Sequence, residues 1–297
     1  MNHPLFVKPA IAAVLSLLVA GLSPVASAAA ESKLHLETIV ADEASIYTTA
    51  VAVVGPTEIL LWDAQFHVPD AKRLADYVAQ SGKHLKAIII SHPDGDHYDG
   101  AAVILDRFPG TPVYMAPAGL EQFNKAAEQG FKNAKARTPD LLPDRLVTPQ
   151  VLPSMKMTVD GEQVEVIPDL QGDMRAKLDS FLWIPSLRAI LAGDLVFSGT
   201  HPYLASSTPA LRADWRASCK RMMDLHPAIV IAGHKKADND SPDSLKFMDK
   251  YMADYDAARE QSSDAASLVA AMTAKYPDLA LPRFLQAAAN ATFPPVK

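Results

Sequence analysis

The stretch AIIISHPDGDHYDG, residues 87–100, starts with an apolar run and then places four potential metal ligands within six positions. The run Ile88–Ile90 is β-branched and predicts a buried strand. Because Pro93 and Gly95 oppose a helix, we expect a tight loop and then a helix that begins near residues 98–102. The ligand-type residues of the loop are His92, Asp94, Asp96 and His97. Imidazole and carboxylate together suit Zn²⁺, Fe²⁺ or Mn²⁺, so the loop predicts a metal site, although the same residues also occur in solvated turns.

The segments around this loop alternate between strand-like and helix-like patterns. Residues 34–64 contain three apolar runs separated by turn residues and predict a β-meander. Residues 68–82 have helical spacing and end at a glycine, and residues 111–117 predict a further strand. This alternation indicates a layered α/β fold.

A second sheet is predicted in the C-terminal half of the chain. Asp160 and Gly161 lie between alternating apolar residues and predict a hairpin. Further strands are expected near residues 180–185, 189–192 and 229–233, with a helix over 209–225 before the last of them. The chain from about residue 242 has a helical pattern, so we expect a helical C-terminal extension.

The composition is ordinary for a soluble globular protein, since 49% of the 297 residues are hydrophobic and 21% are charged. We expect residues 31–297 to form a single domain. The net charge of -6 and the lack of a basic run argue against nucleic acid as a partner. The one cysteine, Cys219, excludes an intrachain disulfide and a multi-thiolate metal site, and its helical surroundings predict a packed thiol.

Residues 1–30 are similar to a secretory signal peptide. Lys8 gives a weak positive start, residues 10–22 form an apolar run, and residues 26–28 match a small-residue cleavage pattern. The run is too short to span a bilayer comfortably, so we expect cleavage after Ala28 or Ala30 and no stable membrane anchor. The sequence therefore predicts a periplasmic or secreted protein.

Three apolar strands lead into a potential metal ligand, namely His92, Asp194 and His234. In layered α/β folds the loops beyond one set of strand ends usually build the site, so these side chains can meet in space. Each residue alone could be an ordinary turn or surface residue. Together with the acidic loop they predict a shared metal site.

The order and spacing of these motifs resemble the metallo-β-lactamase superfamily. The resemblance rests on SHPDGDH at 91–97, the Gly172-Asp173 pair, AGD at 192–194 and AGH at 232–234, and it covers residues 34 to 236. It implies a four-layer αββα sandwich of two mixed β-sheets, with one or two divalent metal ions bound at one edge.

Matched residue by residue, the resemblance also implies roles for individual side chains. The first metal site would consist of His92, Asp94 and Asp173, and the second of Asp96, His97 and His234, with Asp194 bridging both. Asp63 would support the ligand loop through hydrogen bonds, and His201 would line the substrate pocket.

Two positions depart from the family pattern. The family's first motif is HxHxDH, and Asp94 replaces its middle histidine; Asp173 likewise stands where a histidine usually follows glycine. Carboxylates are harder ligands than imidazoles, so Mn²⁺ or Fe²⁺ is favoured more than in the usual pattern, with Zn²⁺ still the first expectation. Two divalent ions would balance the four carboxylates of this ligand set.

These features predict an exported metallohydrolase that acts on a small-molecule ester, lactone, thioester or amide. Asp96 is expected to orient the attacking water and to relay its proton. Two alternatives stay open: a metal- or ligand-binding protein of the same fold without efficient catalysis, and a phosphodiesterase, which the acidic site disfavours through repulsion unless both metals are present.

Overall fold

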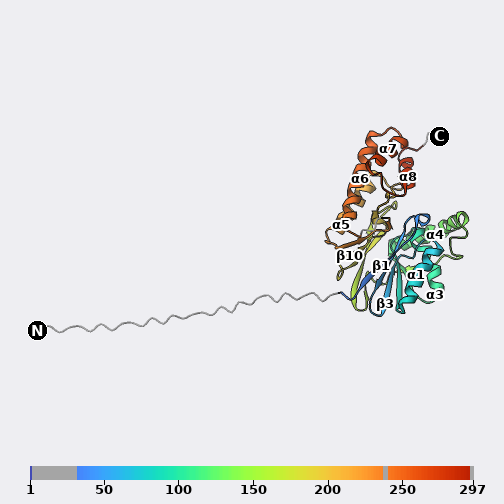
Figure 1. Cartoon of the computed structure of the whole chain (residues 1–297), viewed down its shortest axis with the longest axis vertical. Coiled ribbons are helices and arrows are strands. Elements are labelled where there is room, and N and C mark those ends of the chain that lie inside the picture. The colour runs from blue at the N-terminus through green and yellow to red at the C-terminus, as the bar shows by residue number, and fades with distance from the viewer. Residues whose placement is uncertain (2–31, 237–239, 295–297) are drawn as a thin grey trace. The chain divides into compact units, whose positions relative to one another are not determined.

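Two mixed β-sheets form the centre of the fold, and helices cover the outer face of each (Figure 1). The computed structural model describes residues 1, 32–236 and 240–294. Its contacts separate Met1–Glu31 from Ser32–Lys297, and every helix and strand named below lies in the second unit. The predicted signal peptide, apart from its first residue, lies outside the described residues. Among the helices that are described, none is both long and apolar enough to cross a membrane.

The first sheet has six strands in sequential order, β1 to β6. The first three are antiparallel, which confirms the predicted meander, and the strands β3 to β6 are parallel to one another. Their bounds are β1 His35–Val40, β2 Thr49–Val54, β3 Glu58–Trp62, β4 His84–Ile90, β5 Val113–Met115 and β6 Gln150–Val151.

The second sheet has five strands in the order β12-β10-β9-β8-β7, and only β10 and β12 are parallel. Asp160 and Gly161, at φ 47° and 84°, form the predicted hairpin turn, because both residues of such a tight turn need positive φ. The bounds are β7 Lys156–Val159, β8 Glu162–Leu170, β9 Asp179–Ile184, β10 Ala189–Leu191 and β12 Ile229–Ile231. A small parallel sheet pairs β11 Phe197–Ser198 with β13 His234–Lys235.

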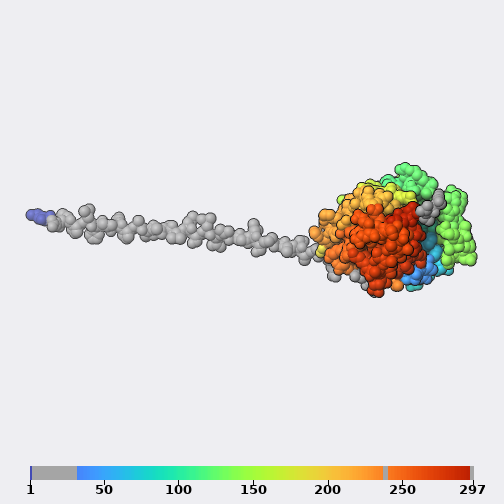
Figure 2. All heavy atoms as spheres, turned by 90° about the horizontal axis from the view of Figure 1, so that it is seen from above, coloured from blue at the N-terminus to red at the C-terminus, as the bar shows by residue number. Residues whose placement is uncertain are grey.

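The helices form the two outer layers. The first sheet is covered by α1 Val68–Ser81, α3 Ala101–Arg107 and α4 Pro117–Arg137. The second is covered by α5 Pro209–Met223, α6 Asp243–Gln261, α7 Ala265–Lys275 and α8 Pro282–Thr292. The last three confirm the expected C-terminal helices. In Figure 2 their orange to red surface forms one continuous face, with the green surface of α4 beside it.

Alternation along the strands explains the layering. In β2, Val51 and Val53 point between the sheets, whereas Ala52 and Val54 point to the helices of the first layer. Side chains of the second sheet, such as Leu182 of β9, complete the core between the sheets. Each such buried aliphatic side chain stabilises the fold by about 1.5–3 kcal/mol. The predicted αββα sandwich is thus confirmed.

One local prediction was wrong. A one-turn helix, α2 Gly95–Tyr98, begins inside the acidic loop, earlier than the expected start at residues 98–102. The side chain of Asp94 accepts a hydrogen bond from the backbone N–H of Gly95 at 2.8 Å and so caps this turn. Two 3₁₀ turns, Glu43–Ser45 and Gly193–Leu195, lie in other loops at this edge of the sheets.

Candidate metal centre

Three buried histidines turn the same ring nitrogen into the site: His92, His97 and His234. Each Nδ1 atom makes a hydrogen bond of 2.8 Å to a neighbouring group. The partner is the hydroxyl of Ser91 for His92, the carboxylate of Asp63 for His97, and the backbone carbonyl of Ile46 for His234. The Nε2 atoms are therefore the ones directed at the carboxylates of the site. This orientation is the usual one for imidazole metal ligands, whose second nitrogen is held by a neighbour.

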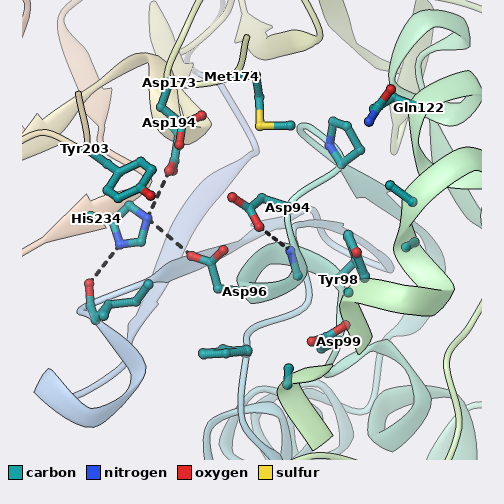
Figure 3. A pocket seen from close by; sticks show the side chains of 18 of the residues that line it. Asp94, Asp96, Tyr98, Asp99, Gln122, Asp173, Met174, Asp194, Tyr203 and His234 are labelled. Carbon is teal, nitrogen blue, oxygen red and sulfur yellow. Dashed lines mark hydrogen bonds and ion pairs between the residues drawn. The ribbon is translucent and has the colours of Figure 1, made fainter. Parts of the chain in front are cut away.

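Two carboxylates lie between these rings. Nε2 of His97 is 3.0 Å from Oδ1 of Asp194 and 3.3 Å from Oδ2 of Asp96. Nε2 of His234 is 3.0 Å from Oδ2 of Asp194 and 3.3 Å from Oδ2 of Asp96. Dashed lines mark both contacts in Figure 3. Nε2 of His92 lies 4.0 Å from Oδ2 of Asp194. Asp194 is thus near all three rings.

Asp63 positions the ligand loop through three hydrogen bonds. Its carboxylate accepts from the backbone N–H of Ser91 at 2.7 Å, from the Ser91 hydroxyl at 2.9 Å and from Nδ1 of His97 at 2.8 Å. Because the Ser91 hydroxyl donates its only hydrogen to Asp63, it accepts from Nδ1 of His92. The Nε2 atom of neutral His92 therefore presents its lone pair to the site.

Burial and neighbouring charges shift the pKa values of the site residues in different directions. Burial, followed by the charge of His97, lowers the pKa of His92 to about 4 and keeps that ring neutral. Burial alone would also lower the pKa of His234, but Asp194 and Asp96 outweigh it and raise this pKa to about 10. Burial would raise the pKa of Asp96, yet His97 and His234 hold it well below its usual range.

Two further buried aspartates, Asp173 and Asp179, lie beside His92. Burial, and then the charge of Asp194, raises the pKa of both carboxyl groups well above the usual range. No hydrogen bond reaches Nε2 of His92 or the Oδ1 atoms of these two aspartates in the described part of the chain. Buried polar atoms without partners are rare and call for an explanation.

Three groups of side chains could each hold a metal ion, because their ligand atoms lie within 4.8 Å of one another. Among the described residues they are His92 with His97 and Asp194, Asp96 with His97 and His234, and His92 with Asp173 and Asp179. The unpartnered atoms and the mixed imidazole and carboxylate donors fit a divalent cation.

A pocket of about 450 Å³ opens above these groups (Figure 3). Its polar wall includes the carboxylates of Asp94, Asp96, Asp99, Asp173 and Asp194. Its less polar wall includes Phe66, Tyr98, Met174, Tyr203 and Phe284. Burial, and then the charge of Asp96, raises the pKa of Asp99 to about 8. This volume suits a small molecule.

Comparison with known proteins identifies the family. The model of the metallo-beta-lactamase superfamily matches residues 46–234, which is more than half of the chain. The chain belongs to the metallo-beta-lactamase superfamily. Its helices α6, α7 and α8 follow the matched region. No curated protein sequence matches the chain.

Solved structures of superfamily members share the fold at low sequence identity. A metallo-beta-lactamase family protein from Thermus thermophilus aligns with a TM-score of 0.60 and 18% identity, over 86% of this chain and 91% of its own. The DIM-1 metallo-beta-lactamase exposed to ceftazidime aligns with 0.56 and 15%, over 75% and 94%. A metallo-beta-lactamase from Pontibacter korlensis aligns with 0.54 and 16%, over 75% and 95%. These similarities support the fold.

Most of the side chains expected from the superfamily pattern lie together. The structure brings His92, Asp96, His97, Asp173, Asp194 and His234 into the candidate groups. Asp63 lies directly behind them. Asp94 faces the pocket but belongs to none of the three groups. Asp179, which was not predicted from the sequence, forms the third group with His92 and Asp173.

The prediction that His201 lines the pocket is corrected by the structure. His201 is not among the lining residues; it is 2% exposed, and its Nδ1 atom is bonded to the hydroxyl of Tyr251 in α6 at 2.7 Å. Burial lowers its pKa to about 4. Tyr203, two residues later, lines the pocket instead. The strand before His234 also ends early, at Ile231, and His234 begins β13.

Proposed function

We propose that this chain is an exported metal-dependent hydrolase that cleaves a small ester, lactone, thioester or amide. The observation that carries the proposal is the convergence of three Nε2 atoms with the carboxylates of Asp96 and Asp194 at the base of a pocket. Membership of the superfamily and the candidate ligand groups support metal-dependent hydrolysis. Export to the periplasm or the exterior rests on the N-terminal sequence pattern.

The residues that would hold the metal are those of the candidate groups. Asp96, His97 and His234 would bind one divalent ion, His92 and Asp173 would contribute to a second, and Asp194 lies within reach of both. When bound, divalent ions lower the pKa of water and polarise a carbonyl oxygen, which is the chemistry that hydrolysis needs. Zn²⁺ is our first expectation, with Mn²⁺ or Fe²⁺ favoured by the carboxylates.

Asp96 is the residue that we assign to orient the attacking water. It is ionised, it lines the pocket, and the hydroxyl of Thr48 donates a hydrogen bond to its Oδ2 atom at 3.1 Å. Its other oxygen can accept a hydrogen from water and so aim the oxygen lone pair at a carbonyl carbon. The raised pKa of Tyr203, caused mainly by burial, keeps its phenol protonated, so it can donate a hydrogen bond to the substrate.

The lining of the pocket limits the substrate. Its five carboxylates face only one lining arginine, Arg137, and no lining lysine among the described residues. Unless two metal ions balance these carboxylates, the wall would disfavour a phosphodiester but not a neutral carbonyl compound. The net charge of -6 disfavours nucleic acid for the same reason. We therefore favour a small uncharged or cationic substrate.

The test combines a metal count with a substrate panel. The purified chain is loaded with Zn²⁺ or Mn²⁺, its metal is measured by elemental analysis, and hydrolysis of nitrophenyl esters, lactones, thioesters and β-lactams is followed. We expect bound metal and turnover of at least one substrate class. His234→Ala should lose metal and activity, whereas His84→Ala, at an exposed position outside the pocket lining, should keep both. Bound metal without turnover on the whole panel would favour the binding-protein alternative.

A further inference from the structure

Asp179 stands at the first residue of β9, where it lies against His92 and Asp173. We propose that Asp179, and not Asp94, completes the first metal position together with these two residues. This inference rests on the metal binding proposed above. It assigns a ligand that the superfamily resemblance did not supply, since the matched position of the first motif is Asp94.

The atoms of this group are arranged for a shared cation. Nε2 of His92 and one carboxylate oxygen from each aspartate lie within 4.8 Å of one another. The three residues are 0%, 3% and 1% exposed, and Nε2 of His92 and both Oδ1 atoms have no hydrogen-bond partner in the described chain. Two buried acids could instead share a proton, but that proton would join them by a hydrogen bond, which these Oδ1 atoms do not make.

Local structure holds the Asp179 carboxylate in place. The backbone N–H of Gly172 donates to its Oδ2 atom at 3.1 Å, which leaves Oδ1 free. A Cβ atom at position 172 would lie 2.6 Å from that Oδ1 atom and 2.7 Å from the Cγ atom, so only glycine leaves room for the carboxylate. The next residue, Ser180, bonds through both its N–H and its hydroxyl to the backbone carbonyl of Ser91. These bonds tie the start of β9 to the loop that carries His92.

Asp94 has a different environment. Its residue is exposed, and its carboxylate accepts a hydrogen bond from the adjacent backbone N–H of Gly95 (Figure 3). An aspartate side chain is shorter than a histidine side chain, so its oxygens stay nearer to its own backbone than an Nε2 atom would. Asp179 reaches the group from the neighbouring sheet and supplies the third donor. Asp94 lines the pocket and is free to contact a substrate.

The two metal positions then differ in donor type. The first has one imidazole and two carboxylates, whereas the second has two imidazoles and the carboxylate of Asp96. Harder, oxygen-preferring cations such as Mn²⁺ should therefore be retained relatively better at the first position than at the second.

Metal counting with two matched variants tests the assignment. The full chain is stripped with a chelator, reconstituted separately with Zn²⁺ and with Mn²⁺, and freed of excess ion. Metal per chain is measured by elemental analysis, and the dissociation constant of the weaker site by chelator competition. We expect Asp179→Asn to lose one ion, or to bind it more than about 100-fold more weakly, since loss of a merely supporting group costs 10–100-fold. Asp94→Asn should bind like the wild type.

The choice of variants separates metal binding from folding. Asparagine can still accept the Gly172 N–H bond, and circular dichroism and thermal unfolding will show whether Asp179→Asn is folded. If it is not, the exposed Asp94→Asn variant still decides, because loss of an ion there would overturn the inference. Equal metal binding by the wild type and folded Asp179→Asn would overturn it while leaving the proposed function standing. A wild-type chain that binds neither ion would overturn both.

Discussion

Replacement of Asp63 by asparagine should weaken metal binding without removing any proposed ligand. One carboxylate oxygen of Asp63 accepts the Ser91 N–H, and the other accepts the Ser91 hydroxyl and Nδ1 of His97. An amide offers only one oxygen, so its NH₂ group must face one of these donors. Either a buried N–H loses its acceptor, or His97 moves its proton to Nε2 and can no longer present a lone pair.

The expected loss follows from these alternatives. An unsatisfied buried donor costs about 1–3 kcal/mol, and loss of a group that supports a metal-binding histidine costs about 10–100-fold in affinity, or about 1.4–2.7 kcal/mol. Chelator competition with Zn²⁺ on the wild type and Asp63→Asn measures this change. At saturating metal the stoichiometry should be unchanged, since all proposed ligands are still present.

A matched control distinguishes this effect from general destabilisation. Asp160, in the β7–β8 turn, also accepts two backbone N–H bonds and one hydroxyl bond, from Thr57 and Glu58. Asp160→Asn should lower the free energy of unfolding but leave the affinity for Zn²⁺ unchanged. A Zn²⁺ affinity of folded Asp63→Asn within about threefold of the wild type, or about 0.7 kcal/mol, would refute the reasoning.

Three further outcomes are expected. Gly233→Ala places a Cβ atom 2.4 Å from Oδ1 of Asp194, so this variant should bind less metal by elemental analysis, and wild-type metal content would contradict the packing argument. At Asp254, hydrogen bonds from two lysines and a tyrosine outweigh burial and lower the pKa to about 2 from 3.8. The lowered pKa stabilises the fold above pH 3.8, and this stabilisation is lost as the pH falls through about 2. Asp254→Asn should therefore lower the unfolding free energy by about 1 kcal/mol at pH 7, after allowance for screening by water. The difference from the wild type should become progressively smaller in acid. Arg212 is 1% exposed and pairs with the partly exposed Asp256, so Arg212→Ala should destabilise by about 2 kcal/mol in urea unfolding, and an unchanged midpoint would exclude a stabilising pair.

Local sequence patterns were sufficient to predict most of the elements. The meander of residues 34–64, the hairpin at Asp160 and Gly161 and the C-terminal helices all appear in the structure, because each depends on short-range periodicity or turn chemistry. The boundaries were less accurate. Strand β12 ends before Gly233, and α2 begins at Gly95, because side-chain caps and pairing with distant strands decide where an element ends.

The position of His201 could not be predicted from its neighbours in the sequence. A histidine in a loop after a proposed ligand is compatible with a pocket wall and with a buried structural role. The ring is held outside the pocket lining by a hydrogen bond to the hydroxyl of Tyr251 in α6, which is 50 residues away in the sequence. Tyr203, two residues after His201, lines the pocket.

By itself the sequence determined that strands and helices would alternate and that His92, Asp194 and His234 would follow apolar runs close to one edge. Only the tertiary structure decided that Asp179 joins them. That residue begins a strand, so a search of strand ends passes over it. Because β9 runs antiparallel to β10, the start of β9 lies at the same edge as the end of β10, beside Asp194. The acidic loop supplies its ligands locally, but the pairing of distant strands completes the group.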